Sequence, residues 1–213
     1  MNQTPFIAVE GPIGVGKTSL SRAIAAHYQF ELFQEIVEEN PFLGKFYDNI
    51  EEWSFQTEMF FLSHRYKQLE EMEKHHLSKK LPVISDYHIF KNKIFAQQTL
   101  SDQHFSKYMK IYDILTEGMP EPNVIIYLNA SLETLLNRIS QRGRQIEKSI
   151  DPAYLERLSS DYERFMHEFE AQHPDIPVLR FNGDEMDFVS NQEDLHTIFQ
   201  SLEKTLKEGD PVK

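Results

Sequence analysis

Residues 10–19 read E-G-P-I-G-V-G-K-T-S and contain the pattern G-x-x-x-x-G-K-[ST]. In this pattern the glycines let backbone N–H groups turn toward phosphate oxygens, the lysine supplies a positive charge, and the threonine hydroxyl can ligate Mg²⁺. A short apolar run precedes the loop, and a helical pattern follows it at residues 18–28 and adds its positive N-terminal end. We therefore predict that the loop binds the phosphates of ATP and that Thr18 ligates Mg²⁺. The loop residues are Gly11, Pro12, Ile13, Gly14, Val15, Gly16, Lys17, Thr18 and Ser19.

Strand and helix patterns alternate along the rest of the chain. Short apolar runs typical of buried strands occur at residues 30–34, 81–85, 123–129 and 178–181. Helical patterns occur at 52–76, 101–118, 131 onward, 154–172 and 193–207, and Ser101 and Ser131 are the expected N-caps of the second and third. This order predicts an α/β fold with a parallel sheet covered on both faces. The 213 residues are expected to form one domain with a frayed tail at 207–213.

Composition narrows the classes of partner. The 22 Lys and Arg against 34 Asp and Glu give a formal net charge of −12, which argues against binding a nucleic acid backbone. No cysteine is present, so disulfides and thiolate metal sites are excluded. No apolar run approaches the ~18 residues of a membrane helix, and residues 1–10 lack the features of a signal peptide. We predict a cytoplasmic protein without a membrane partner.

A switch GTPase would share the phosphate loop, but the chain lacks its other signatures. No Asp is followed by Gly three residues later, so the D-x-x-G motif is missing. The N-K-x-D motif is also missing, because Asn92-Lys93-Ile94 is followed by Phe95.

A small-molecule kinase needs a metal-binding carboxylate, a base near the acceptor, and arginines over the transferred phosphoryl group. Asp86 ends one predicted strand and Glu35 another, at the sheet edge where ligands bind in parallel sheets. Arg138, Arg142 and Arg144 form R-x-x-x-R-x-R, and one helical turn places the first two on the same face, toward one anion. Taken alone, Glu35 could be an exposed carboxylate and the arginines a solvated helix face. Their combination with a phosphate loop favours the kinase.

The order of motifs resembles the deoxynucleoside kinases, and most closely their bacterial deoxyguanosine kinase branch. The segments that carry the resemblance are E-G-P-I-G-V-G-K-T, Q-E-I-V-E-E-N-P, F-Y-D-N…W-S-F-Q, S-D-Y-H and R-I-S-Q-R-G-R, spread over about residues 5–200. The resemblance implies a P-loop kinase fold with a five-stranded parallel sheet. It also implies transfer of the ATP γ-phosphoryl group, with Mg²⁺, to the 5′-hydroxyl of a purine deoxynucleoside, with deoxyguanosine as the first choice.

The resemblance assigns roles on the acceptor side. Glu35 matches the carboxylate that accepts the proton of the 5′-hydroxyl, although Asp86, which matches an acid reaching Mg²⁺ and the phosphates, is the alternative acceptor. Tyr47 and Glu147 match the pair that holds the sugar 3′-hydroxyl. Gln56 matches a glutamine that hydrogen-bonds the base.

On the donor side, the resemblance makes 138–150 a lid that carries Arg138, Arg142 and Arg144. The loop around the donor base matches residues 183–188, with three expected contacts: Asp184, Asp187 and Phe188.

The chain departs from the family pattern after Asp86. Tyr87 stands where the family has an arginine and is followed by His88, and Asn92 stands where the family has a second base-reading acid. We expect all three to contact the substrate, with Lys91, Lys93 or a lid arginine replacing the missing charge. A base-side arginine of the mammalian relatives falls near Ser63 or His64.

Three alternatives stay open: a deoxyadenosine kinase, a broad-range or thymidylate-type kinase, and a catalytically silent nucleotide-binding protein. A monophosphate kinase is disfavoured, because residues 40–52 offer one lysine among several acids. The helical segment 52–72 carries apolar residues on more than one face, which predicts a homodimer, as the family resemblance also implies.

Overall fold

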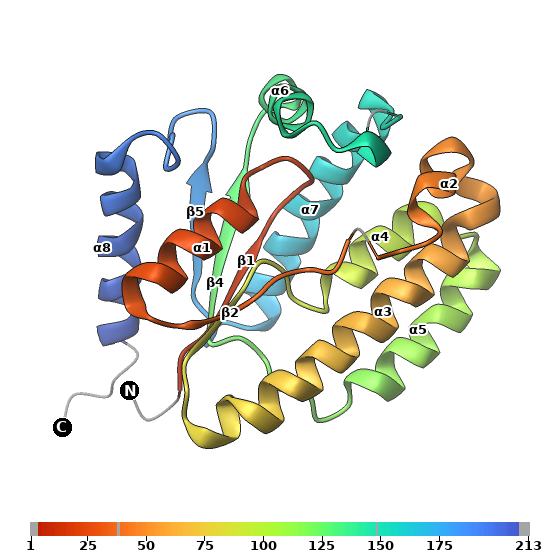
Figure 1. Ribbon diagram of the computed structural model, residues 1–213. Helices are drawn as coiled ribbons and strands as arrows, with labels where there is room; N and C mark the ends of the chain where they lie inside the picture. The colour runs from red at the N-terminus through yellow and green to blue at the C-terminus, as the bar shows by residue number, and fades with distance from the viewer. Residues whose placement is uncertain (1–3, 38, 148, 209–213) are drawn as a thin grey trace.

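A sheet of five parallel strands forms the centre of the molecule (Figure 1). The computed structural model describes residues 4–37, 39–147 and 149–208. The strand order is β2-β3-β1-β4-β5. The strands are β1 Phe6–Glu10, β2 Glu31–Phe33, β3 Val83–Ser85, β4 Val124–Asn129 and β5 Val178–Asn182. The predicted five-stranded parallel sheet is confirmed.

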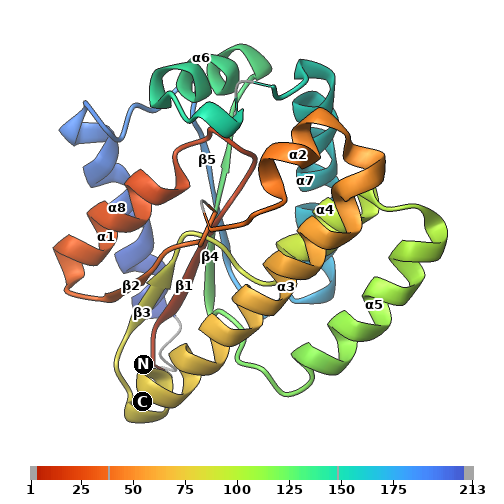
Figure 2. The ribbon, with the colours of Figure 1, turned by 45° about the vertical axis from the view of Figure 1, so that its right-hand side comes forward.

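Helices cover both faces of the sheet, as parallel strands require for their crossover connections. The helices are α1 Lys17–Tyr28, α2 Leu43–Asp48, α3 Ile50–His75, α4 Lys91–Thr99, α5 Asp102–Thr116, α6 Leu132–Arg142, α7 Pro152–Gln172 and α8 Gln192–Glu208, with 3₁₀ turns η1 Leu77–Lys79 and η2 Gln145–Glu147. In Figures 1 and 2, α1 and α8 lie on one side of the sheet, and α3, α4, α5 and α7 lie on the other.

Capping residues explain where several helices begin. The Ser101 hydroxyl accepts a hydrogen bond from the His104 amide and Ser131 accepts one from Thr134, so both predicted N-caps are confirmed. Helices α2 and α4 were not predicted, because the residues before them, Phe42 and Phe90, offer no side-chain cap.

The C-terminal helix is longer than predicted. Helix α8 continues through residues 207 and 208, so the expected frayed tail does not begin at 207. The remainder of that predicted tail, 209–213, lies outside the described residues.

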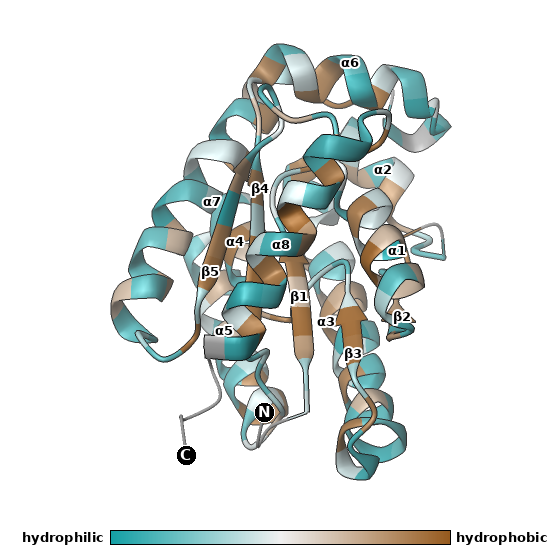
Figure 3. Cartoon of the chain, turned by 90° about the vertical axis from the view of Figure 1, so that its left-hand side faces the viewer, coloured by the Kyte–Doolittle hydropathy of each residue, from teal (hydrophilic) through white to brown (hydrophobic). Residues whose placement is uncertain are grey.

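The core lies on both faces of the sheet. All five residues of β1 are buried, and Figure 3 shows the hydrophobic colour on β1 and β3 while α8 presents largely hydrophilic turns in that view. A second cluster joins β3 to α3 and α5 and includes Leu62, Leu69 and Tyr108, which are at most 4% exposed. Burying each leucine stabilises the fold by about 1.5–3 kcal/mol. Within the described residues, none of the helices has both the length and the apolar character needed to cross a membrane.

Candidate functional site

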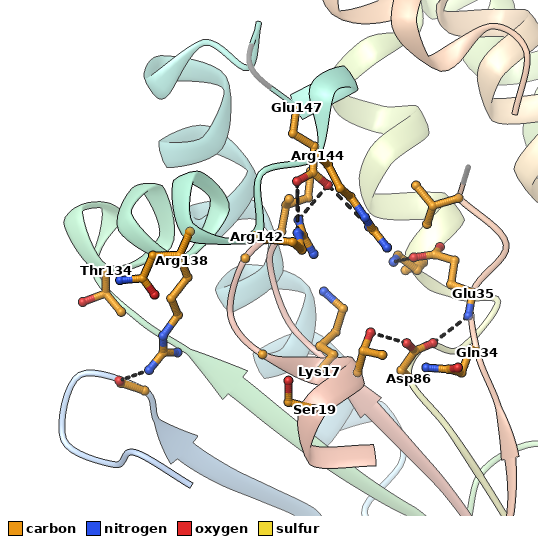
Figure 4. Close-up of a pocket in the computed structure, with 18 of the residues that line it drawn as sticks. Lys17, Ser19, Gln34, Glu35, Asp86, Thr134, Arg138, Arg142, Arg144 and Glu147 are labelled. Carbon is orange, nitrogen blue, oxygen red and sulfur yellow. Dashed lines mark hydrogen bonds and ion pairs between the residues drawn. The ribbon is translucent and has the colours of Figure 1, made fainter. Parts of the chain in front are cut away.

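A cavity of about 1200 Å³ opens where the strands end at their carboxyl edge. The loops after β1, β2, β3 and β5 line it, together with parts of α2, α3, α4 and the segment after α6. Figure 4 shows side chains from these separate elements pointing toward the same space. Parallel strands bring their carboxyl ends to one edge, which explains why segments far apart in sequence meet here.

The glycine loop forms the floor of this cavity at the end of β1. Gly11 has a φ of 144°, and a Cβ there would lie 2.2 Å from the Leu128 carbonyl oxygen, so only glycine fits. Gly16 has a φ of 107° and packs under the Phe188 ring. The Lys17 ammonium donates hydrogen bonds to the carbonyl oxygens of Gly11 at 2.8 Å and Pro12 at 2.9 Å. The backbone of the loop therefore fixes the position of the Lys17 ammonium group.

The charge of Lys17 is poorly solvated. Burial lowers the pKa of Lys17 to about 7, and the nearby Lys91 charge acts in the same direction. A phosphate anion in the cavity would favour the charged form. The loop is therefore suited to an anionic ligand.

Asp86 joins the phosphate loop to the end of β2. Its Oδ2 accepts a hydrogen bond from the Thr18 hydroxyl at 2.5 Å, and its Oδ1 accepts one from the Glu35 amide at 2.7 Å. Burial raises the pKa of the Asp86 carboxyl, and the Glu35 charge raises it further. A hydroxyl beside a carboxylate is the oxygen donor set that Mg²⁺ prefers, so these residues fit the predicted metal ligands.

Glu35 is held by two cations. Its Oε1 accepts hydrogen bonds from the Arg65 guanidinium, one of them from Nε at 3.0 Å, and its Oε2 lies 2.9 Å from the Lys91 ammonium. Burial raises the pKa of the Glu35 carboxyl, but the Lys91 and Arg65 charges more than offset this, and the pKa lies well below its usual range. Glu35 is therefore an ionised hydrogen-bond acceptor at the cavity surface.

The two cations that contact Glu35 can be compared with the residues predicted to replace the family arginine at position 87. Lys91 lines the cavity, whereas Lys93 points away and lies over the Tyr112 ring. Arg65 was missed: it directly follows Ser63 and His64, near which the base-side arginine of the mammalian relatives falls, and it is 4% exposed. The signal available in the sequence was its place among the apolar residues of the helical segment 52–72.

Four predicted substrate contacts do not line the cavity. Gln56 is exposed on α3. The Tyr87 hydroxyl donates to Gln68 at 2.6 Å, and the buried His88 lines two hollows elsewhere, beside Lys93 and Tyr112.

The fourth, Asn92, lies behind Arg65. Its side chain accepts a hydrogen bond from the guanidinium at 2.7 Å and donates one to Tyr108. It supports the site through Arg65 rather than lining it.

The part of the cavity beside α2 and α3, here called the acceptor end, is lined by further side chains. Tyr47 and Glu147, the predicted sugar contacts, both line it. So do Thr57, Glu58 and Tyr154, each of which has a buried oxygen atom without a hydrogen-bond partner within the part of the chain that the structure describes. Aromatic rings of Phe61 and Phe95 line the same cavity. Unsatisfied buried oxygens beside aromatic walls are typical of a ligand site.

The three lid arginines do not converge on one point. Arg142 pairs with Glu147 at 2.6 Å, and Arg144 lies 3.5 Å from the same carboxylate. Arg138 instead donates to the carbonyl oxygens of Val15 at 2.9 Å and Gly183 at 2.8 Å. Figure 4 shows Arg138 turned toward the loop after β5, while Arg142 and Arg144 lie together above Lys17. The expectation of one shared anion for Arg138 and Arg142 is therefore not met.

The loop after β5 closes the donor side. Phe188 is 5% exposed and lies against Gly16. Asp184 accepts hydrogen bonds from the Ser131 amide and hydroxyl, and Asp187 accepts from the amides of Val189 and Ser190. All three predicted loop residues line the cavity.

Comparison with known proteins agrees with this geometry. A sequence model of the family described as "Deoxynucleoside kinase" matches residues 7–207. The chain is 56% identical over 198 residues to the deoxyguanosine kinase of Bacillus subtilis, covering 93% of this chain and 96% of that protein. It is 30% identical over 212 residues to the deoxyadenosine/deoxycytidine kinase of the same organism, covering 96% and 94%. The solved structure of deoxyadenosine kinase from M. mycoides with bound dATP superposes with a TM-score of 0.79 at 26% identity, covering 93% and 99%. Because the family model spans residues 7–207 and a deoxyguanosine kinase is 56% identical over 93% of the chain, the chain belongs to the deoxynucleoside kinase family.

Proposed function

We propose that the protein transfers the γ-phosphoryl group of ATP to the 5′-hydroxyl of deoxyguanosine. The observation that carries this proposal is one continuous cavity with a phosphate loop, two carboxylates and a partly apolar acceptor end. The 56% identity to a deoxyguanosine kinase over 93% of the chain supports the choice of base. A cytoplasmic location and a homodimer remain predictions.

On the acceptor side, Glu35 orients the 5′-hydroxyl and accepts its proton. Its carboxylate is ionised and has a limited exposure of 14%, so it offers a fixed acceptor at the cavity surface. The low pKa makes it a weak base. That suits phosphoryl transfer through a loose transition state, in which positioning of the nucleophile matters more than full proton removal. Asp86 is already engaged with Thr18 and the Glu35 amide, which favours Glu35 over Asp86 in this role.

On the donor side, Lys17 and the arginines neutralise the phosphates. Lys17 exchanges its two loop carbonyls for phosphate oxygens, and Arg142 and Arg144 approach from the lid. Thr18 and Asp86 would hold Mg²⁺, which when bound neutralises charge on the donor phosphates. Arg138 keeps the phosphate loop and the donor-base loop together through its two carbonyl contacts.

A second candidate is a deoxyadenosine or broad-range deoxynucleoside kinase. The relatives at 30% and 32% identity carry those names, as do the solved structures with bound dATP or dCTP. The intact Glu35, Asp86 and Lys17 disfavour a catalytically silent protein.

The test is kcat/KM for deoxyguanosine, deoxyinosine, deoxyadenosine, deoxycytidine, thymidine and guanosine with Mg-ATP under one set of conditions. A mismatched buried polar edge costs about 1–3 kcal/mol, so we expect deoxyguanosine to lead the other bases by roughly tenfold to a hundredfold. Guanosine should be poor, because Tyr47 lies beside the proposed sugar position. A lead for deoxyadenosine or deoxycytidine would refute the deoxyguanosine assignment.

A further inference from the structure

Glu58 is a buried carboxylate at the acceptor end of the cavity that no sequence motif points to. It is 2% exposed, lines the cavity, and its Oε2 has no hydrogen-bond partner among the residues that the structure describes. An unpaired buried carboxylate oxygen is costly unless a ligand satisfies it. Two residues earlier on the same helix, Gln56 is exposed and cannot take this place.

Positive charge and an aromatic surface surround Glu58. Arg65 and Lys91 are the cations whose charges act on its carboxyl group, and Arg65 lies over the Phe61 ring with its guanidinium carbon 4.8 Å from the ring centroid. Arg65 hydrogen-bonds to Glu35 on one side and Asn92 on the other. The guanidinium has five N–H groups, and these contacts leave some of them to donate elsewhere. A carboxylate and a guanidinium therefore lie at the same end of the cavity.

This arrangement is complementary to guanine. The Watson–Crick edge of guanine carries two adjacent donors, N1–H and the N2 amino group, followed by the O6 acceptor. A carboxylate can accept from two adjacent donors, and an arginine can donate to O6. Adenine and cytosine instead present a donor beside an acceptor, which leaves an ionised carboxylate facing a lone pair.

We propose that the Glu58 carboxylate reads the guanine base by accepting hydrogen bonds from N1–H and the N2 amino group, in the place that the sequence assigned to Gln56. This rests on the proposed acceptor site and adds the residue that selects the base. Deoxyinosine lacks the N2 amino group and therefore loses one of the two contacts.

The protonation of Glu58 gives this inference a second signature. Burial raises the pKa of the Glu58 carboxyl to about 7, although the Arg65 and Lys91 charges lower it in part. A neutral carboxyl donates one hydrogen bond and accepts another, which suits adenine, whereas the ionised form suits guanine. The groups that face it are Arg65 on α3, Lys91 and Thr99 on α4, Glu35 after β2, Tyr47 on α2, Tyr108 on α5 and Tyr154 on α7. The preference for deoxyguanosine over deoxyadenosine should therefore rise with pH through the neutral range.

The experiment compares Glu58→Gln with Gln56→Ala and the wild-type protein. For each, kcat/KM is measured with deoxyguanosine, deoxyinosine and deoxyadenosine at several pH values between about 6 and 8. Glu58→Gln should lower the deoxyguanosine-to-deoxyadenosine ratio about tenfold to a hundredfold, shrink the lead of deoxyguanosine over deoxyinosine, and remove the pH dependence of the ratio. Gln56→Ala should change none of these. Burial is the largest influence on the Glu58 carboxyl, and its Oε2 has no hydrogen-bond partner within the described part of the chain, so the Glu58→Gln protein should unfold at or above the wild-type Tm.

The outcomes separate this inference from the proposed function. An equal loss of kcat/KM for all three nucleosides in Glu58→Gln would assign Glu58 a structural role and overturn the inference. So would an unchanged ratio, or a ratio that responds to Gln56→Ala instead. A wild-type protein that prefers deoxyadenosine refutes the proposed function, while the effect of Glu58→Gln on the ratio still decides the role of Glu58. If Glu58→Gln fails to fold, the wild-type lead of deoxyguanosine over deoxyinosine and its pH dependence decide it, and their absence overturns the inference.

Discussion

Replacing Glu35 with glutamine tests catalysis and stability at the same position. The carboxylate accepts hydrogen bonds from Arg65 and Lys91, whose side chains are 5% and 4% exposed. Glutamine keeps the shape but loses the charge, and its amide group donates toward at least one cation that also donates. The substitution therefore leaves buried positive charge without a full counter-charge, and it removes the proposed proton acceptor.

The structure sets the size of both effects. Removing one partner of a buried ion pair costs ~3–5 kcal/mol. We expect the lower end, ~3 kcal/mol, because the glutamine carbonyl oxygen keeps one contact and the Glu35 side chain is 14% exposed. For a chain of this length that lowers Tm by roughly 6–12 °C. Loss of a general base lowers kcat by about 10²–10⁴-fold.

The assay is kcat for deoxyguanosine in a coupled ADP-release measurement, with KM recorded separately and Tm measured in the same buffer. Glu31→Gln, an exposed carboxylate on β2, is the matched control and should change neither quantity. The pKa of Glu35 is lowered on folding, so its stabilisation is complete above the ordinary carboxyl pKa and is lost as the pH falls through the folded pKa. The Tm difference between the wild-type and Glu35→Gln proteins should therefore be constant near neutral pH and shrink in strong acid.

Two results would refute this reasoning. A Glu35→Gln enzyme with kcat within threefold of wild type would move the proton acceptor to Asp86. An unchanged Tm would show that the contacts with Arg65 and Lys91 do not stabilise the fold.

Two further predictions concern the phosphate loop and the oligomeric state. Lys17→Ala should reduce activity below a tenth of wild type, with an unchanged circular dichroism spectrum, because its ammonium donates to two carbonyl oxygens of the loop and is the proposed phosphate contact. A smaller loss, under ~1.4 kcal/mol, would contradict the phosphate-loop role. Light scattering should give a mass of about twice 25.1 kDa, because α3 carries apolar residues on more than one face and Phe60 on this helix is only partly buried. The variant Phe60→Ser should be a monomer, and a wild-type monomer at micromolar concentration would rule out the dimer.

The order of the motifs was enough to predict the fold and the edge of the sheet at which the cavity lies. Gly11, Lys17 and Thr18 lie within eight residues, so their chemistry depends on a local loop that any strand–loop–helix unit can form. Alternating strands and helices require parallel pairing, and parallel strands end at the same edge. For that reason Glu35 and Asp86 could be placed beside the loop without knowing any contact between them.

Packing between the helices determines which side chains around that edge line the cavity. Helix α3 has 26 residues with apolar side chains on several sides, so no single stripe indicates its inward face. Gln56 and Glu58 are two residues apart, a rotation of ~200° about the helix, so only one of them can face the cavity. Packing of α3 against α4 and α5 selects Glu58 and also brings Arg65 to Glu35. Likewise, the turn after β3 directs Tyr87 toward Gln68 and leaves Lys91, four residues later, to reach the Glu35 carboxylate. A sequence pattern gives the spacing along one element, whereas the rotation of that element is fixed only by the neighbours against which it buries its surface.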